Sequence, residues 1–255
     1  MKSLLRKSWR PLLVLLLLFI LWEILVNLFR VPKWLLPSPS DIFQEATLNG
    51  TVLINHLLST LELTLSGFFI GTCIGLITAI LLHLLPYLKD ALYPLLILSQ
   101  NIPTIVLAPL LVIWFGFGML PKIIVITLVC FFPVTVAALD GFKQTPSELR
   151  HYLAMAGANK WQLFSKLEFP YALPSIFSGI KISATYSVLG AVISEWLGAK
   201  EGVGVYMTLA SSSFRTDRVF VAIFIIMILS LLLFALIQGL EKTLVRWQKQ
   251  GDEFK

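Results

Sequence analysis

The sequence predicts an all-α polytopic membrane protein with six transmembrane helices and a two-helix loop on the cytoplasmic side. Of its 255 residues, 57% are hydrophobic and only 13% are charged, whereas a soluble domain carries about 25% charged residues. The apolar residues gather in stretches long enough, or nearly so, to cross about 30 Å of hydrocarbon. These stretches lack the alternation of barrel strands, so a helical bundle is the architecture that satisfies the backbone in lipid.

Six hydrophobic stretches form the predicted helices. They cover residues 11–29, 63–85, 91–115, 123–139, 176–197 and 219–240. The first follows a basic segment, as a signal peptide does, but no small-residue cleavage site comes after it, and we expect it to be retained. No internal repeat divides the chain, so residues 1–255 are expected to form one transmembrane domain.

The distribution of basic residues predicts the orientation, because cytoplasmic loops carry an excess of Lys and Arg. With the amino terminus inside, 14 of the 20 basic residues fall on the inner side, and the outer side holds Arg30, Lys33, Lys122, Lys200, Arg215 and Arg218. Both termini and the loop at 145–174 are therefore predicted to be cytoplasmic. The segment at 30–60 is then extracytoplasmic, and Ser38 followed by Pro39 predicts the start of a short helix there.

Several functional classes are excluded. The net charge of +6 is not arranged as a basic stripe on a polar surface, so we expect no nucleic acid partner. Cys73 and Cys130 lie in apolar spans and are interpreted as core residues. His56, His83 and His151 lack the spacing of metal ligands, and no phosphate-binding glycine loop occurs. The chain therefore cannot bind ATP through such a loop, and any ATP drive must come from a partner.

Two polar or small-residue patterns indicate helix packing. Gly67, Gly71 and Gly75 are spaced four apart in the second span, a spacing that lets two helices approach closely. We interpret these glycines as packing residues. Glu23 and Asn27 in the first span are interpreted as links between helices.

A third set of polar residues lies where a solute could pass. Pro103 is expected to kink the third span, and polar side chains near it should face protein or a water-filled cavity. The fifth span has a face of small polar residues and an acid near its outer end. For Gln100 and Asn101, hydrogen bonding between helices and lining of a path remain alternatives. For Ser183 and Ser187 the alternatives are a close helix contact and a pore wall. Glu195 is either a solvated interfacial acid or a paired or functional carboxylate on the path.

The loop at 145–174 is polar, amphipathic and long enough for two short helices. Thr145, Pro146 and Glu148 predict a capping box at the start of the first helix. Gly157 predicts its end in the left-handed region. Asn159 and Gln162 predict the start of a second helix, which Pro170 and Pro174 should end. Such a folded loop either docks onto a partner or lies on the lipid surface.

The spacing within this loop resembles that of the permease subunit of binding-protein-dependent ABC importers. In that family the loop carries EAA, three residues, Gly, nine residues and I-x-L-P. Gly157 matches the glycine, and Leu167-Glu168-Phe169-Pro170 stands at the last four positions. His151-Tyr152-Leu153 occupies the EAA positions, and this departure affects the contacts with the ATPase.

Several further short segments of the sequence resemble those of the nitrate, sulfonate and taurine branch of the family. That branch also holds permeases for thiamine-precursor pyrimidines and riboflavin. Residues 36–40, 114–118 and 202–204 carry this likeness, while 99–103 and 131–133 look closer to the pyrimidine members. A thiamine-precursor hydroxymethylpyrimidine is the substrate this implies. Nitrate, an alkanesulfonate, taurine and riboflavin are the alternatives.

The resemblance implies a mechanism and a set of partners. Two permease copies, expected to be identical, form the pore in a bacterial plasma membrane. Two ATPase subunits bind ATP and Mg²⁺, and an extracytoplasmic binding protein delivers the solute. The residues implied to couple to the ATPase are Leu149, His151, Tyr152, Leu153, Ala156, Gly157, Trp161 and Phe164. The alternative of a different class is an autonomous secondary transporter or channel.

Overall fold

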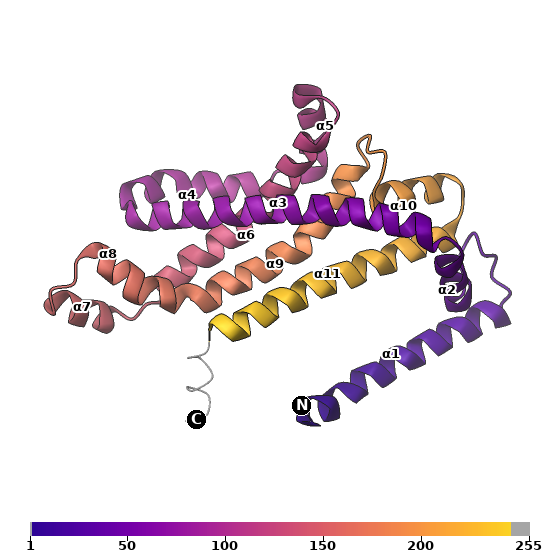
Figure 1. The fold of residues 1–255 in the computed structure, drawn as a ribbon, viewed down its shortest axis with the longest axis horizontal. Helices are drawn as coiled ribbons and strands as arrows, with labels where there is room; N and C mark the ends of the chain where they lie inside the picture. The colour runs from indigo at the N-terminus through magenta and orange to yellow at the C-terminus, as the bar shows by residue number, and fades with distance from the viewer. Residues whose placement is uncertain (1, 246–255) are drawn as a thin grey trace.

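The computed structural model describes residues 2–245, with side chains from residue 9 onward. Every regular element in this part of the chain is a helix, which confirms the all-α prediction (Figure 1). Arg246, Lys249 and Lys255, which entered the charge count, lie outside the described residues.

The elements follow one another along the chain with short connections. In order they are α1 (Lys2–Leu28), α2 (Pro39–Leu48), α3 (Gly50–Leu84), α4 (Pro86–Gln100), α5 (Thr104–Phe115), α6 (Met119–Lys143), α7 (Ser147–Met155), α8 (Lys160–Leu163), the π-helical turn η1 (Phe164–Glu168), α9 (Phe169–Glu195), α10 (Val203–Ser212) and α11 (Thr216–Leu244).

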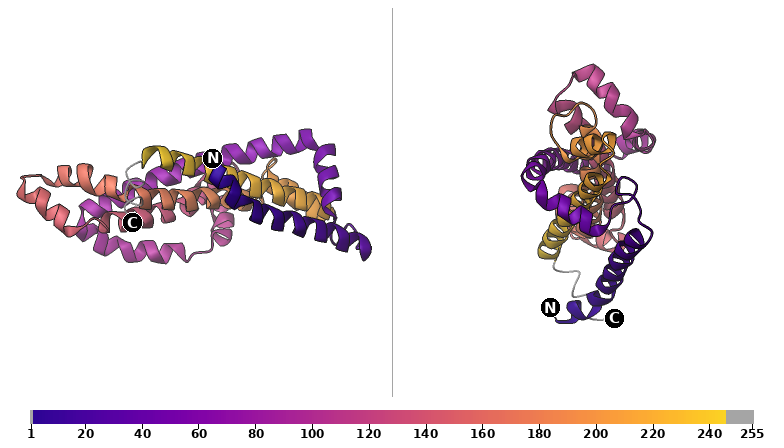
Figure 2. Two further views of the ribbon diagram at one scale, coloured as in Figure 1. Left: turned by 90° about the horizontal axis from the view of Figure 1, so that it is seen from below. Right: turned by 90° about the vertical axis from the view of Figure 1, so that its right-hand side faces the viewer.

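Helix α6 is the centre of the bundle, with its most extensive contacts to α9 and α3. Figures 1 and 2 show an elongated molecule with two distinct ends. The coupling end, as we name it, holds α7, α8 and the turn between α3 and α4. The opposite end, which we call the α2 end, holds α2, α10 and the starts of α3 and α11.

Within residues 2–245, five helices are long and apolar enough to cross a membrane, and the pair α4 and α5 makes a sixth span if counted together. The third span, predicted at 91–115 with a kink at Pro103, is broken more sharply than a kink, because these two helices meet at an angle of 98°. Pro103 explains the break: it lacks an amide hydrogen and adopts an extended conformation as the N-cap of α5. The second span was predicted too short, since α3 begins at Gly50, and α10 was not predicted.

The glycines of α3 lie against α6. A Cβ atom added at Gly71 would lie 2.8 Å from the Thr127 carbonyl oxygen, and one at Gly75 would lie 2.8 Å from that of Phe131. A Cβ at Gly179 of α9 would likewise lie 2.7 Å from the Pro133 oxygen of α6. Backbones this close leave no room for larger residues, so the small residues set the spacing of the three central helices.

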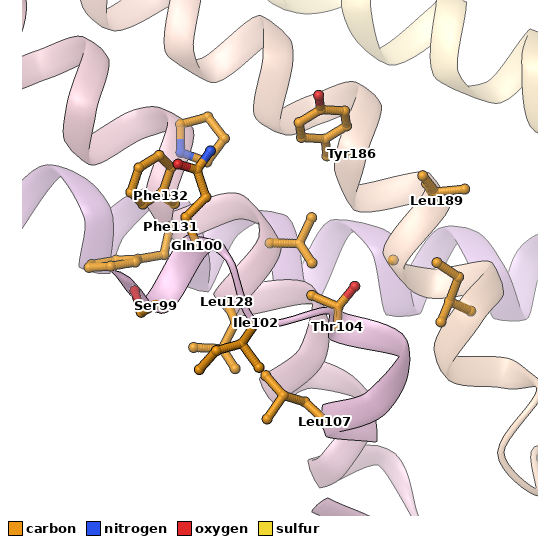
Figure 3. A pocket seen from close by; sticks show the side chains of 14 residues that line it. Ser99, Gln100, Ile102, Thr104, Leu107, Leu128, Phe131, Phe132, Tyr186 and Leu189 are labelled. Atoms are coloured by element: carbon orange, nitrogen blue, oxygen red, sulfur yellow. The ribbon is translucent and has the colours of Figure 1, made fainter. Parts of the chain in front are cut away.

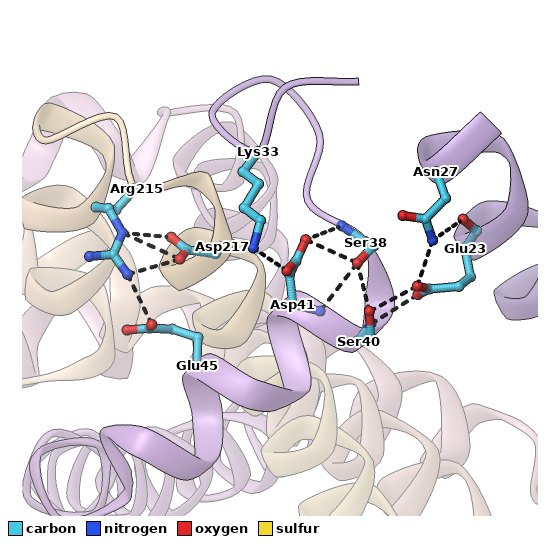
Figure 4. Close-up of polar contacts among 9 residues, drawn as sticks. All are labelled: Glu23, Asn27, Lys33, Ser38, Ser40, Asp41, Glu45, Arg215 and Asp217. Atoms are coloured by element: carbon cyan, nitrogen blue, oxygen red, sulfur yellow. Dashed lines mark hydrogen bonds and ion pairs between the residues drawn. The ribbon is translucent and has the colours of Figure 1, made fainter. Parts of the chain in front are cut away.

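Helix α2 begins as predicted, with Ser38 as its cap. The Ser38 hydroxyl accepts from the Asp41 amide, and Asp41 completes a capping box (Figure 4). Glu23 of α1 accepts hydrogen bonds from the Ser40 amide at 3.0 Å and its hydroxyl at 2.8 Å. The predicted role of Glu23 as a link between helices is therefore confirmed.

The other face of α2 is held by ion pairs. Glu45 is only 7% exposed, and it pairs with Arg215 at 2.9 Å and Arg218 at 2.7 Å near the start of α11. A carboxylate this buried is stable only with such partners. Helix α2 therefore ties α1 to α11 at the α2 end.

Candidate functional site

The coupling end is built around a hairpin of α7 and α8. Helix α7 begins one residue later than the capping-box pattern predicted, with Pro146 as its N-cap and no side-chain cap. Pro146 adopts an extended ψ of 133°, so the helix starts at Ser147 and Thr145 lies one position too early to cap its free amides. The Thr145 prediction was wrong: its hydroxyl is buried with no hydrogen bond partner in the described chain.

The turn between the two helices closes on Gly157, which has a φ of +86°. The Ala158 amide donates to the Leu153 oxygen and the Gly157 amide donates to the Ala154 oxygen, each at 3.0 Å. This pair of bonds is the Schellman arrangement, which requires a residue in the left-handed region. The predicted helix stop at Gly157 is confirmed, and it fixes the angle between α7 and α8.

Helix α8 begins with the predicted capping box. The Gln162 amide donates to Asn159 Oδ1 at 2.8 Å, and the Asn159 amide donates to Gln162 Oε1 at 2.9 Å. The prediction that Pro170 and Pro174 end this helix was wrong, because α8 continues through η1 into α9. Pro170 sits in the first turn of α9, where its missing amide hydrogen costs least.

The hairpin presents large apolar side chains at its surface. Leu149, Tyr152, Met155 and Trp161 are 46%, 68%, 82% and 64% exposed. Of the other residues implied to couple, His151, Ala156 and Gly157 are exposed and Leu153 is partly buried. Phe164 differs from them all: it is buried and its ring contacts those of Phe142 and Phe169. Phe164 is thus part of the hairpin's base and not of its surface.

Between α7 and α8 lies a groove of about 290 Å³. Its lining consists of Leu153, Ala156, Gly157, Ala158, Gln162 and Lys166. A shallow groove between two rigid helices, flanked by exposed apolar residues, is the form that receives a partner's side chain.

A polar clamp fastens the base of the hairpin to α3. Glu168 of η1 is 7% exposed and contacts His83 Nε2, near the end of α3, at 2.6 Å. Arg150 Nε of α7 lies 3.0 Å from the other Glu168 oxygen as an ion pair, without hydrogen bond geometry. This triad could not be predicted from sequence patterns, apart from the position of Glu168 within the I-x-L-P spacing.

A second polar cluster joins α3 to the turn before α10, at the α2 end. Thr60 donates to Glu195 Oε1 at 2.7 Å and accepts from the Val203 amide at 2.8 Å. The Gly204 amide donates to Glu195 Oε2 at 2.7 Å. Glu195 is 1% exposed and is neither a solvated acid nor part of the cavity described next. Helix α3 thus takes part in two polar clusters, one through His83 near its end and one through Thr60, 23 positions earlier.

A cavity of about 480 Å³ opens at the break between α4 and α5 (Figure 3). It is lined by Ser99, Gln100, Ile102, Thr104, Leu107, Leu128, Val129, Phe131, Phe132, Pro133, Tyr186, Leu189, Gly190 and Ile193. Gln100 is the one candidate path residue among them. Phe131, Phe132 and Tyr186 were not predicted to line a path, although 131–133 stood out as a family match.

The remaining path candidates make hydrogen bonds within the bundle. Asn101 Nδ2 donates to the Ile97 oxygen at 3.0 Å. Ser183 and Ser187 are fully buried and donate to the Cys130 and Ala184 oxygens. Of these three, Ser183 of α9 bonds to α6, whereas Ser187 bonds within α9 and the exposed Asn101 bonds back to α4. The structure therefore favours packing for the buried Ser183 and Ser187, and the bond of Asn101 does not join two helices.

No group of three or more His, Cys, Asp or Glu residues that could hold a metal ion occurs within residues 2–245. Cys130 is buried in the packing of α6, and Cys73 is partly buried in α3.

Comparison with known proteins agrees with these features. Residues 71–246 match the family described as binding-protein-dependent transport system inner membrane component. The chain is 38% identical to the formylaminopyrimidine transport permease of Halalkalibacterium halodurans, over 96% of this chain and 98% of that protein. It is 35% identical to the riboflavin transport system permease of Chloroflexus aurantiacus, over 97% and 94%. A methionine ABC transporter solved in an inward-facing conformation shares the fold, with a TM-score of 0.64 and 21% identity over 78% of this chain and 96% of that one.

Proposed function

We propose that this chain, which belongs to the family of binding-protein-dependent transport system inner membrane components, transports a thiamine-precursor pyrimidine. The chain is a permease subunit of an ABC importer, a multi-pass protein of the inner membrane. The autonomous transporter or channel is set aside because the chain falls within this importer family. The pyrimidine assignment is supported by the 38% identity to a formylaminopyrimidine permease over nearly the whole chain.

The permease works, in this proposal, as a homodimer with two ATPase subunits and an extracytoplasmic binding protein. Each ATPase binds ATP and Mg²⁺ and receives one α7–α8 hairpin in a surface groove. The hairpin, both termini and the ATPases then lie in the cytoplasm. The observation that supports docking most strongly is the exposure of Tyr152, Met155 and Trp161 on a hairpin whose backbone is closed by caps at its turn.

The Glu168 clamp passes movement of the hairpin to α3. The Glu168 carboxylate is buried and contacts both His83 and Arg150. A buried carboxylate is costly without such partners, so the three residues move as one unit. His83 and Thr60 lie 23 residues apart on helix α3, about 35 Å at 1.5 Å per residue. Thr60 is bonded to Glu195 and Val203, so a shift at the hairpin reaches this second cluster along one rigid element.

Uptake measurements test the substrate. The permease, its cognate ATPase and its binding protein are expressed in cells that lack their own pyrimidine importer, and labelled hydroxymethylpyrimidine, formylaminopyrimidine, riboflavin and an alkanesulfonate are offered separately. ATP-dependent uptake of either pyrimidine supports the proposal. Uptake of riboflavin or of the alkanesulfonate, with none of either pyrimidine, overturns it in favour of the corresponding alternative.

A further inference from the structure

We propose that the cavity at the α4–α5 break is a substrate site of the permease itself, shaped for a neutral planar heteroaromatic ring whose edge carries both hydrogen bond donors and acceptors. This inference rests on the importer function proposed above. It adds a second point of selection, after the binding protein, and assigns it to named residues.

The walls of the cavity offer aromatic faces that no ring in the chain occupies. Phe131 and Phe132 come from α6 and Tyr186 comes from α9. Within residues 2–245 none of the three contacts another aromatic ring. Figure 3 shows Phe131 and Phe132 on one side of the cavity and Tyr186 on another. Free ring faces around a cavity favour a flat ligand that stacks on them.

The cavity also holds polar groups without partners. Gln100, Thr104 and Tyr186 line it, and their side chains make no hydrogen bond within the described chain. Their neighbours differ: Ser99 donates to the Leu96 oxygen and Asn101 to the Ile97 oxygen. Unpaired polar groups are costly at membrane depth, so these three require water or a ligand.

The chemistry of these groups matches the edge of a heterocycle. A glutamine amide offers donors and an acceptor side by side, and so it can pair with a ring nitrogen and a neighbouring amino group at the same time. The hydroxyls of Thr104 and Tyr186 can donate or accept. An apolar cavity with a few converging polar groups is the usual form of a small-molecule site, and about 480 Å³ falls within its usual range of volumes.

The absence of charge selects among the possible solutes. None of the residues that line the cavity is Lys, Arg, His, Asp or Glu. An anion such as nitrate or a sulfonate would lose its hydration there without a charged partner. The cavity therefore favours a neutral aromatic solute over the anionic alternatives.

Binding measurements on the purified permease–ATPase complex, without the binding protein, test this site. The probe is labelled hydroxymethylpyrimidine, with an alkanesulfonate as the comparison ligand. The variant Gln100→Leu keeps the volume and removes the amide, and we expect it to weaken pyrimidine binding about tenfold. Tyr186→Phe removes one hydroxyl and serves if Gln100→Leu fails to assemble. Leu98→Ala, exposed on the same helix and outside the cavity, should bind as the unmodified complex does.

The outcomes separate this inference from the proposed function. Weaker binding in Gln100→Leu or Tyr186→Phe, with normal binding in Leu98→Ala, supports the site. Pyrimidine uptake by the whole system with no binding to the unmodified permease complex overturns the site and leaves the proposed function standing. Unchanged binding in both cavity variants, together with loss of the permease dimer, also overturns it and assigns the cavity to the contact between two copies.

Discussion

The α7–α8 hairpin and the cavity at the α4–α5 break both interrupt the straight membrane helices. They differ in which groups are left without a partner. In the hairpin the backbone is capped by the Gly157 turn and the Asn159 box, while large apolar side chains are exposed. In the cavity, apolar rings form the walls, and the side chains of Gln100 and Thr104 lack partners. The exposed apolar surface of the hairpin suits contact with a protein. The unpaired polar side chains of the cavity suit the binding of a small solute.

The largest effect is expected from disturbing the hairpin turn. Gly157→Val places a β-branched residue at a φ of +86°, a strain of about 1–3 kcal/mol. A Cβ at this position meets nothing within 4 Å, so the damage is confined to the backbone of the turn. We expect ATP-dependent uptake to fall by one to two orders of magnitude while solute binding at the cavity is unchanged.

Gly239→Ala is the matched control for that variant. Gly239 lies inside α11 and also has open space around an added Cβ, so uptake should remain normal. Normal uptake in Gly157→Val would mean that the hairpin does not require its present shape.

A smaller effect is expected at the base of the hairpin. Glu168→Ala removes the carboxylate that contacts both His83 and Arg150, and uptake should fall about tenfold, which corresponds to about 1.4 kcal/mol of lost transition-state stabilisation. The control is Glu148→Ala, since Glu148 is exposed and, within residues 2–245, its side chain hydrogen bonds with Ser147 alone. Uptake that is equal in the two variants would contradict the clamp.

The comparison also shows which parts of the structure can be predicted from the sequence. Gly157 and the Asn159–Gln162 pair act on neighbouring amides, so their local patterns were enough to predict the turn and the second cap. The break at Pro103 was predicted only as a kink, because the angle depends on how α5 packs against α6. The Glu168 and Glu195 clusters could not be predicted, because their partners are far away in the sequence. Glu168 lies 85 positions from His83, and Glu195 lies 135 positions from Thr60.

The path candidates also could not be distinguished from one another by their sequence pattern. Gln100, Ser183 and Glu195 are all polar residues in apolar spans, and the pattern alone treats them alike. Tertiary packing separates them, because Ser183 and Glu195 find partners across the bundle while Gln100 does not.

The smallest effect is expected at the α2 end, where capping serves the fold alone. Ser38→Ala removes the cap of α2 and should lower the free energy of unfolding by about 1 kcal/mol, with no change in ATPase coupling. A shift of melting temperature in detergent measures the loss. A loss of coupled ATPase activity in this variant would show that the cap of α2 contributes to more than folding.

The same cap carries a dependence on pH. Burial raises the pKa of Asp41, but hydrogen bonds from Lys33 and Ser38 outweigh it and leave the pKa below its usual range. A carboxyl whose pKa is lower in the folded state stabilises the fold above its unfolded value of about 4 and loses that contribution as the pH falls through the folded value. Asp41→Asn should therefore flatten the acid side of the stability curve, and an unchanged curve would contradict this account.

Disulfide cross-linking between the hairpin and the ATPase tests the central claim most directly. Met155→Cys places a thiol at the most exposed apolar position of α7, in a background where Cys73 and Cys130 are replaced by alanine, and Leu98→Cys serves as the control. The account predicts a cross-link between Met155→Cys and a cysteine in the groove of the cognate ATPase, with none for Leu98→Cys. Equal cross-linking in both variants, or none in a complex that still imports solute, would contradict it.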